Sequence, residues 1–98
     1  MSRRLEVLIF EPLPGAEPRV HALLHASRRR AEQAGWHCWA YRNQVQPSEL
    51  TLFIEGPEPV PGGPAAPALR DEMGEIEALS SRFDAARSLT EYQWDDEP

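Results

Sequence analysis

Residues 36–55, WHCWAYRNQVQPSELTLFIE, decide the fold that this sequence predicts. Two runs rich in aromatic and β-branched residues flank a short turn that contains Pro47 and Ser48. Proline presets its own φ angle and serine can hydrogen-bond to its own backbone, so both residue types favour a turn. The segment is therefore predicted to form a β-hairpin. Because an isolated hairpin is only marginally stable in water, other elements must cover it.

Segments on both sides of the hairpin supply those elements. Residues 4–10 (RLEVLIF) predict a strand, and residues 17–34 predict an amphipathic helix that closes at a glycine. After the hairpin, residues 68–87 carry apolar side chains at helical spacing, which predicts a second helix that includes Phe83. Residues 88–94 (SLTEYQW) predict a last strand.

The length of 98 residues and an apolar content of 41% predict one small globular domain. We expect this domain to span residues 1–94, with residues 95–98 as a solvated acidic tail. Residues 56–67 (GPEPVPGGPAAP) hold five prolines and three glycines, which excludes a regular element. This segment is either a plain connection or a lid.

The order strand, helix, strand, strand, helix, strand predicts an α+β, ferredoxin-like βαββαβ fold. Right-handed crossovers place both helices on one face of a four-stranded antiparallel sheet. Alternation then sorts the strand residues between two faces. The helix-covered face is expected to take Leu5, Val7, Ile9, Trp36, Cys38, Ala40, Leu50, Leu52, Ile54 and Leu89. The uncovered face is expected to take Leu8, Phe10, Trp39, Tyr41, Phe53, Tyr92 and Trp94.

Six of the eight aromatic residues fall on the predicted uncovered face. A soluble monomer rarely exposes so large an apolar patch. Each large apolar side chain gains about 1.5–3 kcal/mol when buried, and several together exceed the estimated cost of association. We therefore expect a homodimer in which two sheets pack face to face, with either a filled core or a cavity between them.

The charge distribution limits the classes of binding partner that the sequence predicts. The formal charge is −6, and residues 50–98 carry eleven acidic side chains against three arginines. Net acidity argues against general nucleic-acid binding, which needs cations to replace phosphate counterions. Residues 28–30 are the one basic cluster, placed late in a predicted helix, and read as a solvated helix end rather than an anion site.

The sequence contains one cysteine and no recognisable targeting signal. Cys38 is the single cysteine, so no intrachain disulfide or cysteine zinc site is expected, and it is predicted to be buried and inert. No apolar run reaches transmembrane length, and the first ten residues lack the features of a signal peptide. We expect no membrane contact and a cytoplasmic location.

Polar residues on the predicted aromatic face are the candidate catalytic groups. His37 is a candidate general base, and Tyr41 and Asn43 are candidates to orient an oxygen atom. Glu6 and Glu55 share the parity of this face and read as rim carboxylates or as an acid or base. The structural alternative is that these polar groups are satisfied at an interface. The expected ligand-binding set is Phe10, Trp39, Phe53, Tyr92 and Trp94, which equally suit simple packing.

His21 and His25 stand four residues apart in the first predicted helix. That spacing puts both rings on one flank, where they can chelate a divalent metal ion. Because the sequence fixes no third ligand nearby, the pair is interpreted as a surface pair and no metal site is expected.

The segment Gly35-Trp36-His37-Cys38-Trp39-Ala40-Tyr41, the turn at residues 47–49 and the strand at residues 50–55 resemble one known group of proteins. These stretches are similar to antibiotic-biosynthesis-monooxygenase-like domains of the dimeric α+β barrel superfamily. The resemblance implies a homodimer with a cavity between sheet and helices. It also implies oxygenation of a small aromatic ligand without a cofactor. The haem-degrading branch of the superfamily has an asparagine in its first strand and a histidine in its second long helix. Residues 5–10 hold no asparagine and residues 68–87 hold no histidine, so haem breakdown is not expected.

Two functions follow from these observations and both stay open here. The first is a monooxygenase-like enzyme that acts on a small aromatic or enolisable molecule without a cofactor. The second is a non-catalytic module for dimerisation or small-ligand binding, in which the aromatic face serves only as an interface.

Overall fold

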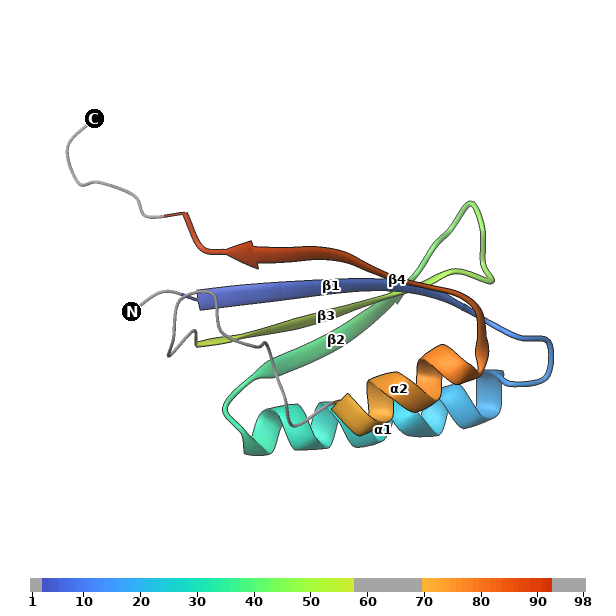
Figure 1. The fold of residues 1–98 in the computed structure, drawn as a ribbon, viewed down its shortest axis with the longest axis horizontal. Helices are drawn as coiled ribbons and strands as arrows, with labels where there is room; N and C mark the ends of the chain where they lie inside the picture. Colours follow the sequence, from blue (N-terminus) through green and yellow to red (C-terminus); the bar gives the residue numbers. More distant parts are fainter. Residues whose placement is uncertain (1–2, 58–69, 93–98) are drawn as a thin grey trace.

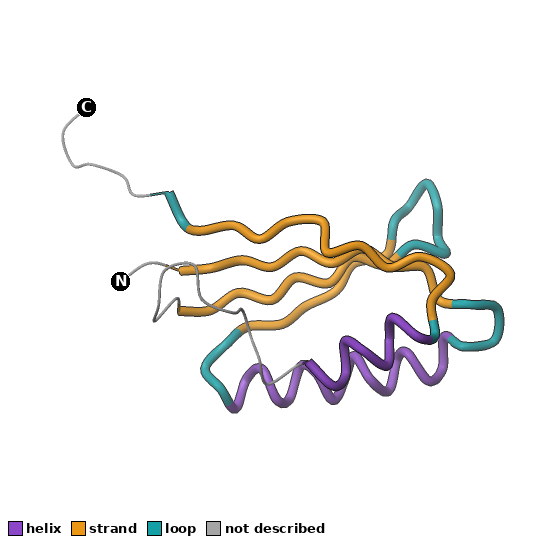
Figure 2. Tube along the Cα trace, viewed as in Figure 1, coloured by secondary structure: helices purple, strands orange, loops and turns teal. Residues whose placement is uncertain are grey.

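The computed structural model describes residues 3–57 and 70–92. Its elements form two layers, a sheet and a pair of helices that cover one face of the sheet (Figure 1; Figure 2). The chain order is β1 (Arg3–Pro12), α1 (Glu17–Gln33), β2 (His37–Arg42), β3 (Leu50–Pro57), α2 (Arg70–Ala78) and β4 (Ser80–Thr90). Within these residues the sheet has four strands in the order β2-β3-β1-β4, all antiparallel. The expected α+β, ferredoxin-like fold is confirmed.

Helix α1 follows the sequence expectation to within one residue. Pro18 lies in its first turn, where a missing N–H costs nothing. Its buried stripe is Val20, Leu23, Ser27 and Ala31. The Ser27 hydroxyl donates to the Leu23 carbonyl at 2.8 Å, which satisfies this polar group inside the core. Gly35 then adopts a φ of +81°, a left-handed conformation that suits glycine after a helix end.

Helix α2 is much shorter than expected, and the prediction of a helix over 68–87 is wrong beyond Ala78. Residues 80–90 form β4, which pairs with β1 from Pro12 to Arg4. Two hydrogen bonds fix the change of direction. The Ser80 hydroxyl donates to the Ile76 carbonyl at 2.7 Å, and the Leu13 N–H donates to the Leu79 carbonyl at 2.8 Å. A strand that began only at residue 88 would leave half of β1 unpaired, so sheet pairing prevails over the helical spacing.

The two faces of strand β1 are exchanged relative to the prediction: the residues expected on the uncovered face lie under the helices. Phe10 pairs with Leu50 and Leu8 with Leu52, so both face the helices. Phe10 is completely buried, and Leu8 packs against the core. Conversely, the residues of β1 and β4 that were expected under the helices lie on the uncovered face: Leu5, Val7, Ile9 and Leu89. Because both faces of β1 are apolar, alternation alone could not choose between them.

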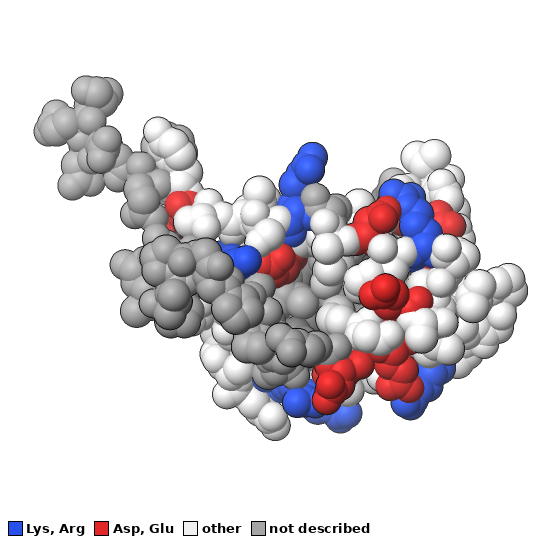
Figure 3. All heavy atoms as spheres, in the orientation of Figure 1, with Lys and Arg blue, Asp and Glu red and all other residues white. Residues whose placement is uncertain are grey.

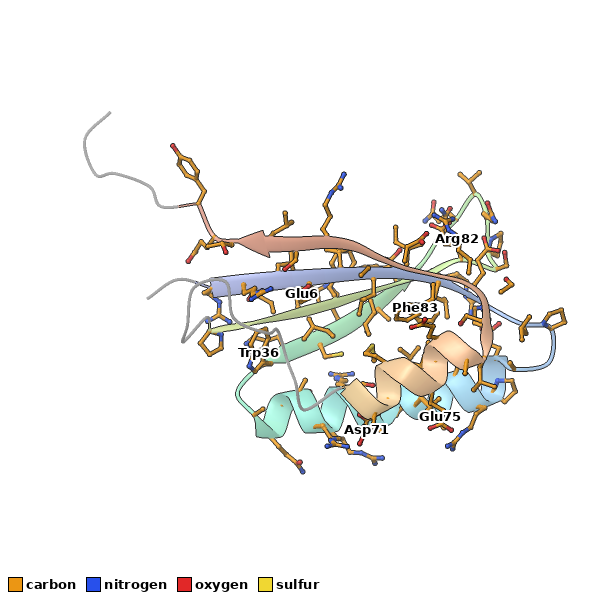
Figure 4. The ribbon with its side chains drawn as sticks, viewed as in Figure 1. Glu6, Trp36, Asp71, Glu75, Arg82 and Phe83 are labelled. Carbon is orange, nitrogen blue, oxygen red and sulfur yellow. The ribbon has the colours of Figure 1, made fainter. Side chains whose placement is uncertain are left out.

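The core lies between the sheet and the two helices. Its buried apolar residues are Phe10, Val20, Leu23, Ala31, Cys38, Leu50, Leu52, Ile54 and Ile76. Phe83 reaches this core from β4, and Trp36 reaches it from the start of β2 (Figure 4). At Gly56 a side chain would overlap the indole of Trp36, so glycine allows the ring to lie against the backbone of β3.

Opposite charges lie side by side along the helices (Figure 3). Arg19 pairs with Glu75 at 2.6 Å and Arg28 with Glu32 at 3.1 Å. The Arg28 pair agrees with a solvated helix end for the basic cluster at 28–30. Neither helix in the described ranges is long and apolar enough to cross a membrane. Gly56 and Pro57, which were expected in a loop, belong to β3. Residues 58–67 of that predicted loop, Trp94 and the tail at 95–98 lie outside the described residues.

Candidate functional site

The uncovered sheet face carries three of the predicted site residues as one cluster. Trp39 and Phe53 are cross-strand neighbours whose rings stack, with centroids 5.6 Å apart and an interplanar angle of 12°. Tyr41 meets the edge of Phe53 with centroids 5.7 Å apart. Trp39 is 36% exposed and Tyr41 is 62% exposed. The hairpin therefore presents an accessible aromatic surface, as its alternation predicted.

His37 lies at the edge of this aromatic cluster. It pairs with Glu55 across β2 and β3, and Trp39 is two residues further along the same face. Glu55 in turn accepts hydrogen bonds from the Arg3 guanidinium at 3.1 and 3.2 Å. Histidine, carboxylate and arginine thus follow one another at one end of the uncovered face, next to the stacked rings. A base and a charge pair beside an aromatic surface can bind and deprotonate a flat acidic molecule.

Asn43 has a structural task in the β2–β3 turn. Its side-chain oxygen accepts the backbone N–H groups of Val45 and Gln46 at 2.8 and 3.0 Å. Its side-chain nitrogen donates to Glu49 at 3.2 Å. Both ends of the amide therefore hold the turn, in the manner of an Asx turn. The structure does not bring Asn43 into the aromatic cluster.

Phe10 does not belong to the aromatic surface, contrary to the sequence expectation. It is buried under the sheet and stacks on Phe83, with centroids 6.0 Å apart. Tyr92 lies two residues beyond the end of β4 and is 71% exposed. Trp94 lies outside the described residues. Of the predicted ligand-binding set, the structure brings together Trp39 and Phe53.

A groove that the sequence did not reveal lies between α1 and β2. It has a volume of about 270 Å³ and is lined by His21, Leu24, His25, Arg28, Cys38, Trp39, Ala40 and Leu52. A second hollow of about 210 Å³ continues along the same helix and strand and shares His21, Leu24 and Ala40. The small side chain of Ala40 on an edge strand opposite a helix is the one sequence signal for this space.

Cys38 lies in the wall of the groove and is buried, as expected. Burial raises the pKa of its thiol from 9.0 to about 11, against the opposing effect of the nearby Arg28 cation. The protonated thiol is a poor nucleophile and metal ligand, so Cys38 is chemically quiet at neutral pH.

A polar cluster lies on the helix side of the sheet, where Glu6 was not expected. Glu6 faces the same side as Ile54, not the aromatic face (Figure 4). The Arg4 guanidinium donates to Glu6 at 2.7 Å and to Ser88 at 2.8 Å, and the Ser88 hydroxyl donates to Glu6 at 2.7 Å. The closed triangle satisfies the partly buried charge of Glu6, and of the two predicted carboxylates only Glu55 lies on the uncovered face.

Within residues 3–57 and 70–92, no group of three or more His, Cys, Asp or Glu side chains is arranged to hold a metal ion. A fully protein-ligated metal centre is therefore not built from the described residues. Two-ligand arrangements are a separate case.

Solved structures share this fold over almost their whole length. Rv0793 from Mycobacterium tuberculosis superposes with a TM-score of 0.68 at 17% identity, with both chains covered in full. SnoaB from Streptomyces nogalater, a cofactor-independent oxygenase solved as a mutant, gives 0.66 at 13% identity, over 98% of this chain and 97% of its own. An antibiotic biosynthesis monooxygenase gives 0.63 at 12% identity, over 97% of this chain and 100% of its own. The protein shares the α+β fold of these antibiotic-biosynthesis-monooxygenase-like structures.

These solved structures confirm the resemblance to antibiotic-biosynthesis-monooxygenase-like domains that residues 35–55 suggested. No protein-family model matches the chain. No curated protein sequence matches the chain significantly. The likeness is therefore one of three-dimensional fold over the whole chain. The β2–β3 hairpin carries the exposed rings on one side and one wall of the α1–β2 groove on the other.

Proposed function

We propose that the protein is a homodimeric, monooxygenase-like enzyme that oxidises a small aromatic or enolisable molecule without a cofactor. One observation carries the proposal: Trp39, stacked on the half-buried Phe53, is exposed beside His37 on a sheet face that the helices leave uncovered. Neighbours of this fold that are oxygenases support the reaction class.

The homodimer is proposed from the apolar content of the uncovered face. Seven apolar or aromatic side chains lie on it: Leu5, Val7, Ile9, Trp39, Tyr41, Phe53 and Leu89. Each gains about 1.5–3 kcal/mol on full burial, whereas association costs an estimated 4–15 kcal/mol. The seven together offset that cost even though several are already half-buried. A second copy of the sheet presents the same apolar side chains, so it can cover this face.

The chemistry assigned to the face starts with proton removal. His37 takes a proton from an acidic carbon or hydroxyl of a substrate that stacks on Trp39, and Tyr41 holds the developing oxyanion. The resulting carbanion supplies the electrons that reduce dioxygen. The net reaction turns a CH₂ group and O₂ into a C=O group and water, so the four electrons come from the substrate carbon.

Oxygen uptake tests the reaction. Purified protein is mixed with a panel of aromatic ketones that carry an acidic CH₂ group, and dioxygen consumption is followed with product analysis. His37→Ala is expected to lower turnover by about 10²–10⁴-fold, the usual contribution of general base catalysis. Added imidazole is expected to restore part of it, whereas Val45→Ala, at a 94% exposed turn residue, leaves it unchanged. Unchanged turnover in His37→Ala contradicts the assignment of the base.

Sedimentation tests the dimer. Val7 lies in β1 on the uncovered face, opposite Phe53, so Val7→Arg places a charge between the packed sheets. This variant is expected to be a monomer at micromolar concentration, while Val45→Arg, which makes the same change on the turn, stays a dimer. A wild-type protein that sediments as a monomer contradicts the proposal of a sheet-to-sheet dimer.

The alternative function is a non-catalytic dimerisation or ligand-binding module. The centre of the uncovered face favours it, because Val7 and Ile9 are compact aliphatic side chains that pack against a copy without leaving a void. A dimer that consumes no oxygen with any substrate of the panel supports this second function.

A further inference from the structure

Two histidines on α1 already lie in contact. The Nε2 atoms of His21 and His25 are 3.1 Å apart, and the ring centroids are 4.6 Å apart with an interplanar angle of 77°. Both side chains are exposed on one flank of a seventeen-residue helix. The helix backbone fixes the spacing, so little conformational freedom is lost when both nitrogens bind the same ion.

The separation of the two Nε2 atoms matches that of two ligands of one metal ion. Imidazole nitrogens bind zinc at about 2.0–2.1 Å, so two of them on one ion lie about 2.9–3.4 Å apart for bond angles between square and tetrahedral. The observed 3.1 Å falls inside that range. Without metal, one ring donates a hydrogen bond to the other, and an ion takes the place of the shared proton.

The surroundings of the pair suit a cation with open coordination positions. Both rings line the groove of about 270 Å³ between α1 and β2, so an ion held by them borders that space. The two arginines that line the groove and its neighbouring hollow are each paired with a carboxylate. Arg28 binds Glu32 at 3.1 Å, and Arg42 binds Glu17. The paired carboxylates offset the repulsion that these arginines would otherwise exert on a metal ion.

We propose that His21 and His25 form a two-histidine site for a divalent transition-metal ion at the mouth of the α1–β2 groove. Neutral imidazoles select ions such as Zn²⁺, Ni²⁺ and Cu²⁺ over Mg²⁺ and Ca²⁺, and Cu²⁺ binds most tightly in the usual order of stability. Water fills the remaining positions, and an anionic oxygen ligand in the groove can displace it. This site lies between α1 and β2, and Trp39 borders both its groove and the aromatic face.

Metal titration of tag-free, chelator-treated protein tests the site. We expect one equivalent of Ni²⁺ or Zn²⁺ to bind and to raise the thermal unfolding midpoint with rising metal concentration. His21→Ala and His25→Ala are each expected to weaken binding by about tenfold or more, a loss of about 1.4 kcal/mol. His37→Ala, which removes the one histidine outside the pair, is the matched control and is expected to bind as the wild type does. Binding should weaken in acid, because protons compete for the same nitrogens.

A spacing variant separates chelation from mere histidine content. The double substitution His25→Ala/Arg29→His keeps three histidines but moves the second ring by about 6 Å along the helix axis, so that it lies about 12 Å from His21. It is expected to bind no better than His25→Ala. In NMR spectra, substoichiometric Cu²⁺ is expected to broaden the ring signals of His21 and His25 and to spare those of His37. Equal affinity in the wild type and the double variant, or broadening of His37 first, overturns the proposal.

Discussion

Phe10 in β1 lies opposite Phe83 in β4, and their rings stack with centroids 6.0 Å apart and an interplanar angle of 27°. Phe10 is fully buried, and Phe83 packs against the same core (Figure 4). The pair ties the two strands together on the side that faces the helices. It therefore couples the β1–β4 pairing to the packing of α1 and α2.

Removing one ring of this pair should destabilise the fold strongly. Phe83→Ala leaves a cavity against Phe10 and is expected to lower the free energy of unfolding by about 3–5 kcal/mol. Tyr92→Ala, an aromatic-to-alanine change at a 71% exposed position, is expected to cost less than about 1 kcal/mol. Urea denaturation followed by circular dichroism measures both. Similar costs for the two variants would show that the Phe10–Phe83 contact does not stabilise the fold.

The contact between Trp36 and Gly56 predicts a rescue. In Gly56→Ala the new methyl group overlaps the indole, and we expect a loss of about 1–3 kcal/mol of unfolding free energy from overpacking. Trp36→Ala removes the obstacle, so the double variant should be more stable than the sum of the two single changes implies. Urea titration of all four proteins gives the coupling energy. Strict additivity contradicts the contact.

Asn43 should matter for the turn more than for chemistry. Asn43→Ala leaves the N–H groups of Val45 and Gln46 without their acceptor, and we expect a loss of about 1–2 kcal/mol in unfolding free energy. Gln44→Ala, at the exposed neighbouring position, serves as the control. If Asn43→Ala unfolds as the wild type does but loses oxygen uptake, the residue belongs to the reaction and not to the turn.

The buried thiol of Cys38 gives a pH-dependent prediction. Its pKa is raised from 9.0 to about 11 in the folded protein, so its contribution to stability is complete below pH 9 and is lost as the pH rises towards 11. Cys38→Ala should therefore lose less stability than the wild type across that interval, as measured by urea titration at several pH values. Because only the thiolate reacts, iodoacetamide at neutral pH should label the native protein far more slowly than the urea-unfolded protein. Equal labelling rates would mean that the thiol is accessible and ionised.

The hairpin was predictable from the sequence because its two faces differ in chemistry. In β2 and β3 the rings of Trp39, Tyr41 and Phe53 alternate with small or aliphatic residues such as Cys38 and Leu52. Only one face of the hairpin therefore suits the core, and in the structure that face lies towards the helices. The helix at 17–34 was equally clear, since a proline opens it and a glycine follows it.

Strand β1 and the end of α2 were not predictable, for two different reasons. Leu5, Val7 and Ile9 are as apolar as Leu8 and Phe10, so only the fit of the large ring into the core decides which set is covered. At the end of α2, Phe83 stands at helical spacing from Ile76, yet it also satisfies a strand position opposite Phe10. The pairing of β4 with β1 makes Phe83 a strand residue, and the local sequence pattern carries no information about that pairing.

The candidate site was predictable in part, where it depends on the hairpin. His37, Tyr41, Trp39 and Phe53 share a face by alternation alone. The turn-holding bonds of Asn43 depend on a loop conformation that spacing does not specify. The α1–β2 groove depends on how far a helix lies from an edge strand, and that distance is a tertiary property.

The stacked rings, the histidine beside them and the inner wall of the groove all come from one uninterrupted piece of chain, residues 37–55. A block exchange of those nineteen residues between proteins of this fold would transfer the aromatic face and one wall of the groove together, while β1, β4 and both helices keep their own sequences. A few changes within this one segment can therefore alter both surfaces and leave the rest of the fold unchanged.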